Sequence, residues 1–168
     1  MEWKVLETKE FLANPFDMIG NQWMLITAQK PDGTTNTMTA SWGGMGVMWG
    51  KNVVFVVIRP QRYTKEFVDA SGAFTLSFFK EEYKKQLAYL GKVSGRTQNK
   101  IEESGLTLEM LDQKPVFQQA SLTIKCKSLY VQPISPDHFL QKEIEQRWYP
   151  KKDYHILYVA EIEQIYQK

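Results

Sequence analysis

A continuous run of β-branched and aromatic residues, Val53–Ile58, constrains the fold of this chain most. It reads Val-Val-Phe-Val-Val-Ile and lies between the polar pair Lys51-Asn52 and the turn-forming pair Arg59-Pro60. A short apolar run with such boundaries is typical of a strand that is buried on both faces. We therefore expect the chain to fold around a β-sheet that contains this segment.

Five further segments show the residue patterns of strands. Trp23–Gln29 is rich in β-forming residues, and the turn signal Pro31-Asp32-Gly33 separates it from the alternating segment Asn36–Trp42. These two segments are expected to pair as a hairpin. The remaining candidates are Ala73–Phe79, the alternating segment Leu122–Tyr130, and His155–Ile165.

Short helical patterns lie between these strands. Thr64 is expected to cap a turn over Phe67–Ala70, Glu81–Leu90 is expected to form a helix that stops at Gly91, and Asp137–Trp148 is a further helix candidate. Five or six strands with a few short helices predict a closed or partly closed β-barrel.

Charge and cysteine content exclude several classes of function. The net charge of +2 is too small to predict nucleic acid or a membrane surface as the main partner. The single cysteine, Cys126, cannot form an intramolecular disulfide, and two histidines with one cysteine are too few for a closed zinc site, so no metal is expected. No repeat or linker divides the 168 residues, so we expect one domain over residues 1–168.

The N-terminus Met1–Lys4 lacks the basic and then apolar pattern of a signal peptide. No stretch approaches the roughly 18 consecutive apolar residues of a membrane span. We therefore expect a cytoplasmic protein.

The glycine-rich segment Gly43–Gly50 does not match a nucleotide-binding fingerprint. Its G-x-G-x-x-G frame, counted from Gly44, ends on Trp49, and no βαβ pattern surrounds it. We expect these glycines to shape a loop between strands. A chain without its own nucleophile or metal can still be an enzyme if a cofactor supplies the chemistry.

Three other segments together supply what a flat mononucleotide needs. Asn36–Gly44 combines small and hydroxyl residues, which let a ligand approach backbone N–H groups, with an aromatic wall at Trp42. Arg59–Lys65 contains two arginines and a threonine at an expected helix start, a pattern that suits a phosphate dianion. Gly91–Arg96, with Lys100 beyond it, is again cationic and loop-like. Taken singly, each segment also fits a turn, a strand end or a solvated basic loop.

Trp42 has two interpretations. It could be a core residue at a strand end, or its indole could lie beside a bound ring. Its neighbours, Ala40-Ser41 and Gly43-Gly44, leave room for a ligand and support a packed core poorly. The sequence therefore favours the second interpretation.

The motifs in these segments resemble those of a known family. Asn-x-Met-Thr-Ala-Ser-Trp-Gly-Gly at 36–44, Arg-Pro-x-Arg-Tyr-Thr at 59–64, Ser-Phe at 77–78 and Val-Ser-Gly-Arg at 93–96 occur in this order. Their combination resembles the flavin reductase-like, FMN-binding split-barrel family, especially its flavoredoxin branch, over about Trp23 to Ile162. The resemblance implies a mainly β fold: a six-stranded Greek-key split β-barrel with a few short helices. It also implies a homodimer with FMN near the subunit interface.

The resemblance further implies which residues contact FMN. Those expected along the isoalloxazine and the ribityl chain are Asn36, Thr39, Ala40, Ser41 and Trp42. Those expected at the phosphate are Arg59, Arg62, Tyr63 and Thr64, with Ser94, Gly95, Arg96 and Lys100 on the other side. His155 falls where many relatives carry a histidine before the last strand, often after Gly-Asp. It is the candidate catalytic residue on the nicotinamide side, but here it follows Asp153-Tyr154, which leaves that role open.

The function implied is an FMN-dependent oxidoreductase that passes hydride from NAD(P)H to flavin and then electrons to an acceptor. Two alternatives remain: an electron carrier of the flavoredoxin type that a redox partner protein reduces, or a barrel that binds flavin without turning it over. A nucleic-acid binder is disfavoured by the near-neutral charge. The segments Leu108–Gln119 and Gln141–Lys152 match nothing specific, so their roles are open.

Overall fold

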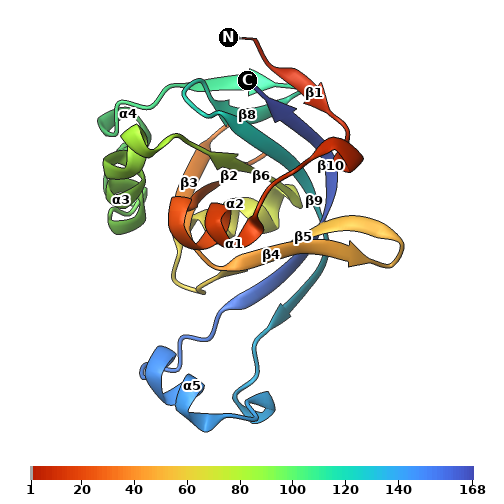
Figure 1. Cartoon of the computed structure of the whole chain (residues 1–168). Helices are drawn as coiled ribbons and strands as arrows, with labels where there is room; N and C mark the ends of the chain where they lie inside the picture. The colour runs from red at the N-terminus through yellow and green to blue at the C-terminus, as the bar shows by residue number, and fades with distance from the viewer. Residues whose placement is uncertain (1) are drawn as a thin grey trace.

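The structure is a computed structural model that describes residues 2–168, and Figure 1 shows a strongly curved sheet with short helices around it. The strands are β1 (Lys4–Leu6), β2 (Met24–Gln29), β3 (Thr35–Ala40), β4 (Gly43–Met48), β5 (Lys51–Ile58), β6 (Ala73–Phe78), β7 (Leu108–Leu111), β8 (Lys114–Phe117), β9 (Leu122–Pro133) and β10 (Ile156–Gln167). The helices are α1 (Pro15–Asp17), α2 (Tyr63–Ser71), α3 (Lys84–Lys92), α4 (Lys100–Glu103) and α5 (Lys142–Trp148), with shorter or irregular turns at η1 (Thr8–Glu10), η2 (Met18–Gln22), η3 (Glu81–Tyr83) and η4 (Pro136–His138).

The main sheet has eight strands in the order β3-β2-β6-β9-β10-β5-β4, with β1 paired to β10. All of its pairs are antiparallel. The mainly β, split-barrel fold expected from the sequence is confirmed. All six predicted strands are present, as β2, β3, β5, β6, β9 and β10. The sheet also contains β1 and β4, and β7 and β8 form a separate hairpin inside the unassigned segment Leu108–Gln119.

The long strands β9 and β10 join the two halves of the sheet. Their pairing shifts register between Val159 and Ala160 and again between Ile162 and Gln164. Such bulges increase the bend and twist of a strand, which helps the sheet to curl. At the ends of the path lie β3 and β4, which follow each other in the chain but are not hydrogen-bonded neighbours. The barrel is therefore split at the residues that connect them, Ser41 and Trp42.

Two hydrophobic cores lie on opposite faces of β2. Met24 and Ile26 point into the barrel core, whereas Leu25 packs in a second core with residues of α3 and β8. The sequence predicted that Val53–Ile58 would be buried on both faces, and this is only partly correct. Val54, Val56 and Ile58 are buried in the barrel core, but Phe55 and Val57 are half-buried because the second core does not extend over β5.

The predicted loop at Gly43–Gly50 is wrong, because Gly43–Met48 forms β4 and pairs with β5. Gly43 has φ +151°, and a Cβ atom there would lie 2.3 Å from the carbonyl oxygen of Phe55. Glycine thus permits the close approach of the two strands at this point rather than a loop. The chain reverses at Trp49-Gly50, where both residues have positive φ.

The helices also differ from the predictions at their ends. The N-cap of α2 is Arg62, which makes no capping bond with its side chain, so Thr64 is not the cap. Helix α3 passes through Gly91 and ends one residue later. The predicted helix Asp137–Trp148 is interrupted, because only η4 and α5 are helical within it.

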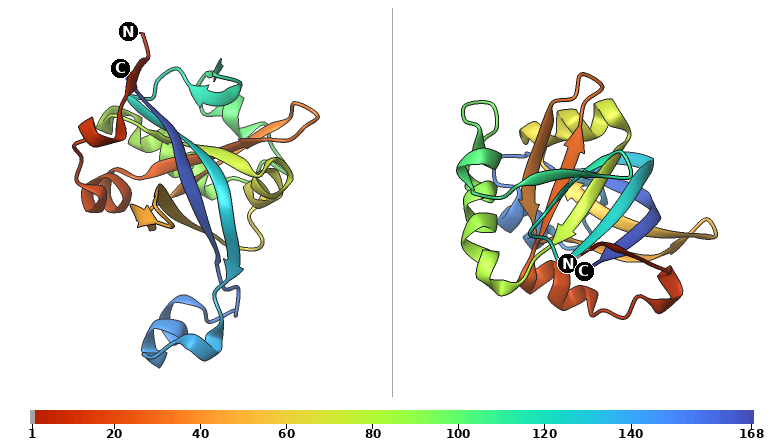
Figure 2. Two further views of the ribbon diagram at one scale, coloured as in Figure 1. Left: turned by 90° about the vertical axis from the view of Figure 1, so that its right-hand side faces the viewer. Right: turned by 90° about the horizontal axis from the view of Figure 1, so that it is seen from above.

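The segment that contains η4 and α5 projects from the barrel at one end of β9 and β10, as Figures 1 and 2 show. We call residues 134–155 the arm. None of the helices within residues 2–168 has the length and apolar character needed to cross a membrane.

Candidate functional site

A cavity of about 180 Å³ opens at the split between β3 and β4. Its wall combines the last residues of β3, the end of β5 and two residues of the arm. We call it the tryptophan cavity. It is lined by Met38, Thr39, Ala40, Ser41, Trp42, Val57, Arg59, Arg62, Trp148 and His155.

Trp42 forms one wall of the tryptophan cavity and remains 38% exposed. Its ring meets Trp148 edge-on, at 4.9 Å between centroids and 87° between planes. His155 lies on another side, at 5.1 Å between ring centroids. This exposure excludes the alternative of a packed core tryptophan, and the ring contacts create an aromatic surface that is open to a flat ligand.

Arg59 ties the arm to the barrel. Its guanidinium forms an ion pair with Asp153 at 2.6 Å and donates a hydrogen bond to the backbone oxygen of Trp148 at 3.0 Å. Asp153 also accepts a hydrogen bond from Gln61, and these contacts lower its pKa. The guanidinium of Arg59 is therefore engaged mainly in holding Trp148 over the tryptophan cavity.

His155 is 8% exposed, and its Nδ1 lies 2.8 Å from the hydroxyl of Tyr149. Burial, together with the positive charge of Arg59, lowers the pKa of His155 to about 4. The imidazole is therefore neutral at pH 7. It can donate or accept a hydrogen bond at that pH, but it does not hold the extra proton of a general acid.

A second cavity, of about 440 Å³, adjoins the tryptophan cavity along β3. The residues of β3 up to Asn36 face this second cavity and those from Met38 onward face the first, so the two lie end to end. We call it the basic cavity. It is lined by Thr34, Thr35, Asn36, Tyr63, Phe67, Gly95, Arg96, Thr97, Gln98, Asn99, Lys100 and Ile101.

Two cations, the buried Lys100 and the half-buried Arg62, stand near the junction of the cavities. Lys100 Nζ donates to the carbonyl oxygens of Leu90 and Val93, both at 3.0 Å, and Arg62 donates to that of Gly91 at 2.8 Å. Burial and the nearby charge of Arg62 lower the pKa of Lys100 to about 8, and burial lowers the pKa of Arg62. Within residues 2–168, no carboxylate pairs with either side chain. The predicted loop Gly91–Arg96 is wrong at Gly91 and Lys92, which belong to α3, and Lys100 just beyond it begins α4.

The rest of the predicted phosphate-binding residues have protein partners. Arg96 pairs with Glu66 and lies over the ring of Tyr63, 4.4 Å from its centroid. Thr64 is buried, and its hydroxyl accepts a hydrogen bond from Asn36 at 2.9 Å. Gly95 packs so closely on Asn36 that an added Cβ would lie 2.3 Å from its Oδ1.

The structure thus divides the predicted site residues into two neighbouring groups. The tryptophan cavity brings together Thr39, Ala40, Ser41, Trp42, Arg59, Arg62 and His155. The basic cavity brings together Asn36, Tyr63, Gly95, Arg96 and Lys100. Thr64 and Ser94 line neither cavity.

Sequence reasoning missed the part that the arm contributes. Trp148 closes the tryptophan cavity, and Tyr149 and Asp153 hold His155 and Arg59. The adjacent pair Trp148-Tyr149, seven and six residues before His155, was the available signal. It was weak because only the folded arm brings these rings to the barrel.

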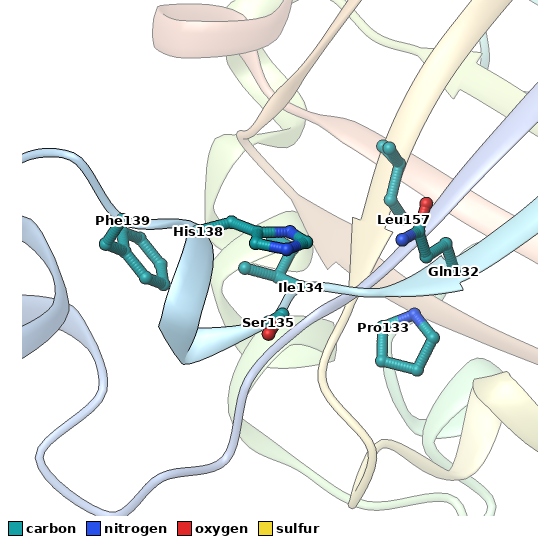
Figure 3. A pocket seen from close by; sticks show the side chains of 7 residues that line it. All are labelled: Gln132, Pro133, Ile134, Ser135, His138, Phe139 and Leu157. Atoms are coloured by element: carbon teal, nitrogen blue, oxygen red, sulfur yellow. The ribbon is translucent and has the colours of Figure 1, made fainter.

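A third cavity, of about 230 Å³, lies where the arm leaves β9 and β10, and Figure 3 shows its side chains. Leu157 in its wall pairs in register with Val57, which faces the tryptophan cavity, so both side chains lie on the same face of the sheet. It is lined by Gln132, Pro133, Ile134, Ser135, His138, Phe139 and Leu157. Within residues 2–168, no group of three or more His, Cys, Asp or Glu side chains is placed to hold a metal ion.

The chain is similar to known proteins in sequence and in fold. A family model described as the flavin reductase like domain matches residues 16–168. The solved structure of an FMN-binding domain of a flavin reductases-like enzyme from Shewanella baltica OS155 matches with a TM-score of 0.70 and 19% identity, over 99% of this chain and 77% of that chain. No curated protein sequence matches this chain.

Two further solved structures are similar. Flavoredoxin of Desulfovibrio vulgaris (Miyazaki F) matches with a TM-score of 0.67 and 21% identity, over 87% of this chain and 69% of that chain. The styrene monooxygenase flavin reductase of Pseudomonas putida S12 matches with a TM-score of 0.62 and 16% identity, over 86% and 77%. At these identities the likeness shows a shared fold, and the family model adds a match over most of the sequence.

Proposed function

This chain belongs to the flavin reductase-like family, and on that basis we propose that it binds FMN and passes hydride from NAD(P)H through the flavin to an electron acceptor. The ring of FMN would occupy the tryptophan cavity. Its phosphate would lie at the junction between the tryptophan cavity and the basic cavity. When bound, FMN supplies the redox chemistry, and the protein supplies binding, orientation and electrostatics.

The single observation that supports FMN most is the pair of cations at the junction, the buried Lys100 and the half-buried Arg62. Among residues 2–168, Arg62 and Lys100 are bonded only to backbone carbonyl oxygens, and burial disfavours their charged forms. A phosphate dianion beside them would supply the missing counter-charge through charge-assisted hydrogen bonds. The residues present therefore fit the charged end of a mononucleotide.

The tryptophan cavity fits the other end. At about 180 Å³ it is smaller than the roughly 300 Å³ at which enclosed sites for whole small-molecule ligands begin, so it suits one flat ring with the rest of the ligand outside. Trp42 and Trp148 would exclude water from that ring, and neutral His155 would offer a hydrogen bond. The site residues named from the sequence, apart from Thr64 and Ser94, remain our proposal for direct contacts with FMN. Thr64 would act through Asn36, and Ser94 through the loop that contains Arg96.

A second candidate function is electron transfer without direct nicotinamide oxidation. The likeness to flavoredoxin supports it as much as the likeness to a flavin reductase supports the first. In that case a partner protein would reduce the flavin, and the exposed edge of Trp42 would face the partner.

We also propose that the protein is a homodimer in the cytoplasm. Exposed apolar side chains gather on the β4–β5 hairpin and on β9, where Trp49, 57% exposed, lies 6.1 Å from Tyr130 between ring centroids. Such a patch suits a twofold contact. The buried Cys126, the only cysteine, is compatible with a reducing compartment.

Anaerobic reduction of the purified, FMN-loaded protein tests the proposal. We expect NADH or NADPH to bleach the flavin absorbance at a rate fast enough to support catalytic turnover. Flavin that stays oxidised with both nicotinamides, but is bleached by dithionite, would reject the reductase and favour the carrier. Failure of the protein to bind FMN at all would reject both functions.

A further inference from the structure

Tyr149 lies immediately after α5, in the part of the arm to which the sequence assigned no role. It is 6% exposed, and its hydroxyl lies 2.8 Å from Nδ1 of His155. Its ring meets the imidazole nearly at right angles, at 5.5 Å between centroids. The ring of Trp42 also contacts the imidazole, with 5.1 Å between centroids. Two aromatic rings and one hydrogen bond therefore hold the imidazole in place.

The hydrogen bond between Tyr149 and His155 can have either direction, and the surroundings distinguish the two. If Nδ1–H donated to the phenol, the buried Tyr149 hydroxyl would need another acceptor. Within residues 2–168 its only side-chain partner is His155. A buried donor without an acceptor costs roughly 1–3 kcal/mol, so this direction is disfavoured.

In the other direction the Tyr149 hydroxyl donates to Nδ1, and the proton of the neutral ring resides on Nε2. The phenolic oxygen then remains an acceptor. Burial raises the pKa of Tyr149, so its hydroxyl keeps the proton that it donates, and Arg59 lies 5.2 Å from the ring centroid. The other charged groups near the imidazole are Asp153 and Arg62.

We propose that Tyr149 is a positioning residue that fixes His155 as the Nε2–H tautomer, so that its free N–H is available as a neutral donor to a ligand in the tryptophan cavity. This inference rests on the proposed function for the identity of that ligand. The class of ligand atom recognised is a hydrogen-bond acceptor, such as a carbonyl oxygen or a ring nitrogen. Tyr149 thus determines the tautomer of His155, another residue of the arm, without itself contacting the ligand.

The tautomer can be measured by long-range ¹H–¹⁵N NMR on the ligand-free protein. The chain has two histidines, so His138 serves as an internal reference. We expect His155 to show an unprotonated Nδ1 and a protonated Nε2. In Tyr149→Phe the two ¹⁵N shifts should move toward each other, as in a tautomer mixture. Tyr154→Phe is the matched control, because its hydroxyl bonds to Glu145 instead, and it should leave the pattern unchanged.

A kinetic measurement connects the tautomer to function. In FMN-loaded protein, Tyr149→Phe should slow flavin reduction about fivefold, as expected for one neutral hydrogen bond, and should weaken FMN binding by no more than about the same factor. Tyr154→Phe should reduce at the parent rate. A protonated Nδ1 in the parent, an unchanged NMR pattern in Tyr149→Phe, or an altered pattern with an unchanged rate would each overturn the inference. A parent protein that shows the expected tautomer but binds no flavin would instead reject the proposed function.

Discussion

Arg62 is the residue whose replacement separates phosphate binding from folding most directly. Its guanidinium bonds to the carbonyl of Gly91 and stands beside Lys100 at the junction of the two cavities. A charge-assisted hydrogen bond to phosphate contributes roughly 1.5–3 kcal/mol. We therefore expect Arg62→Ala to weaken FMN binding at least about tenfold and riboflavin binding much less.

Isothermal titration with both ligands checks this prediction. Lys92→Ala is a suitable control, because Lys92 is an exposed cation at the end of α3, next to the Gly91 carbonyl to which Arg62 bonds. Equal losses for FMN and riboflavin in Arg62→Ala would show that the residue acts through the fold of the site.

Trp42 belongs to the wall of the cavity, so its replacement should affect the ligand more than the fold. An aromatic contact adds about 0.5–1.5 kcal/mol beyond burial of area. Trp42→Phe should keep the melting temperature, bind FMN modestly more weakly, and show less FMN-dependent quenching of tryptophan fluorescence. Trp3→Phe, whose ring lines neither the tryptophan cavity nor the basic cavity, should quench like the parent. A lower melting temperature with unchanged quenching would place the flavin ring elsewhere.

His155 should make stability depend on pH in the mildly acidic range. Its folded pKa of about 4 lies below the unfolded value of about 6.5, so the unfolded chain binds the proton first. The free energy of unfolding should therefore fall as the pH decreases from 6.5 toward 4, by up to about 3 kcal/mol from this group. Above pH 6.5 the group should have no effect.

Urea unfolding at pH 7 and pH 4.5 measures this dependence. His155→Gln should lose less stability between the two pH values than the parent does. His138→Gln replaces the other histidine, which lies in the arm, and should behave like the parent. Parallel pH profiles for the parent and His155→Gln would contradict the prediction.

At the scale of elements, β4 depends on a single glycine. A Cβ at Gly43 would collide with the Phe55 backbone, whereas one at Gly44 would be 3.8 Å from its nearest neighbour, the Phe55 ring. We expect Gly43→Ala to lower the free energy of unfolding by roughly 1–3 kcal/mol or more, and Gly44→Ala to change it little. Denaturant melts of the two variants give the comparison. Equal stabilities would mean that β4 can move away from β5 without cost.

The elements that local patterns specify were predicted, and the others were not. β2, β3 and β5 have β-branched or alternating residues bounded by turn signals, which determine a strand locally. β4 is rich in glycine and has no such pattern, because it forms only where β5 offers an edge. The small neighbours of Trp42 predicted a site wall rather than a packed core, and the indole is 38% exposed in the wall of the tryptophan cavity. Trp148 was not found, because its contact with Trp42 depends on how the arm folds back.

For the whole molecule, the open patch on the β4–β5 hairpin and β9 predicts self-association. Light scattering at micromolar concentration should give about twice the 19.6 kDa mass of one chain. Val131→Lys, within the patch, should shift the protein toward the monomer. Leu12→Lys is the control, because Leu12 is 93% exposed but lies outside the patch. A monomeric parent that still binds FMN would remove the second subunit from the proposed site.

Arg62 and Lys100 are fastened to the carbonyl end of α3 before any ligand arrives. Long cationic side chains that are free in solution lose about 0.5–1.5 kcal/mol of rotamer entropy each when a ligand immobilises them. In this protein that loss already occurs during folding. The anion site is therefore preorganised, and replacing the helix carbonyls by phosphate would exchange one set of acceptors for a stronger one with little further ordering. Differences in affinity among related ligands should then appear chiefly in how long each remains bound.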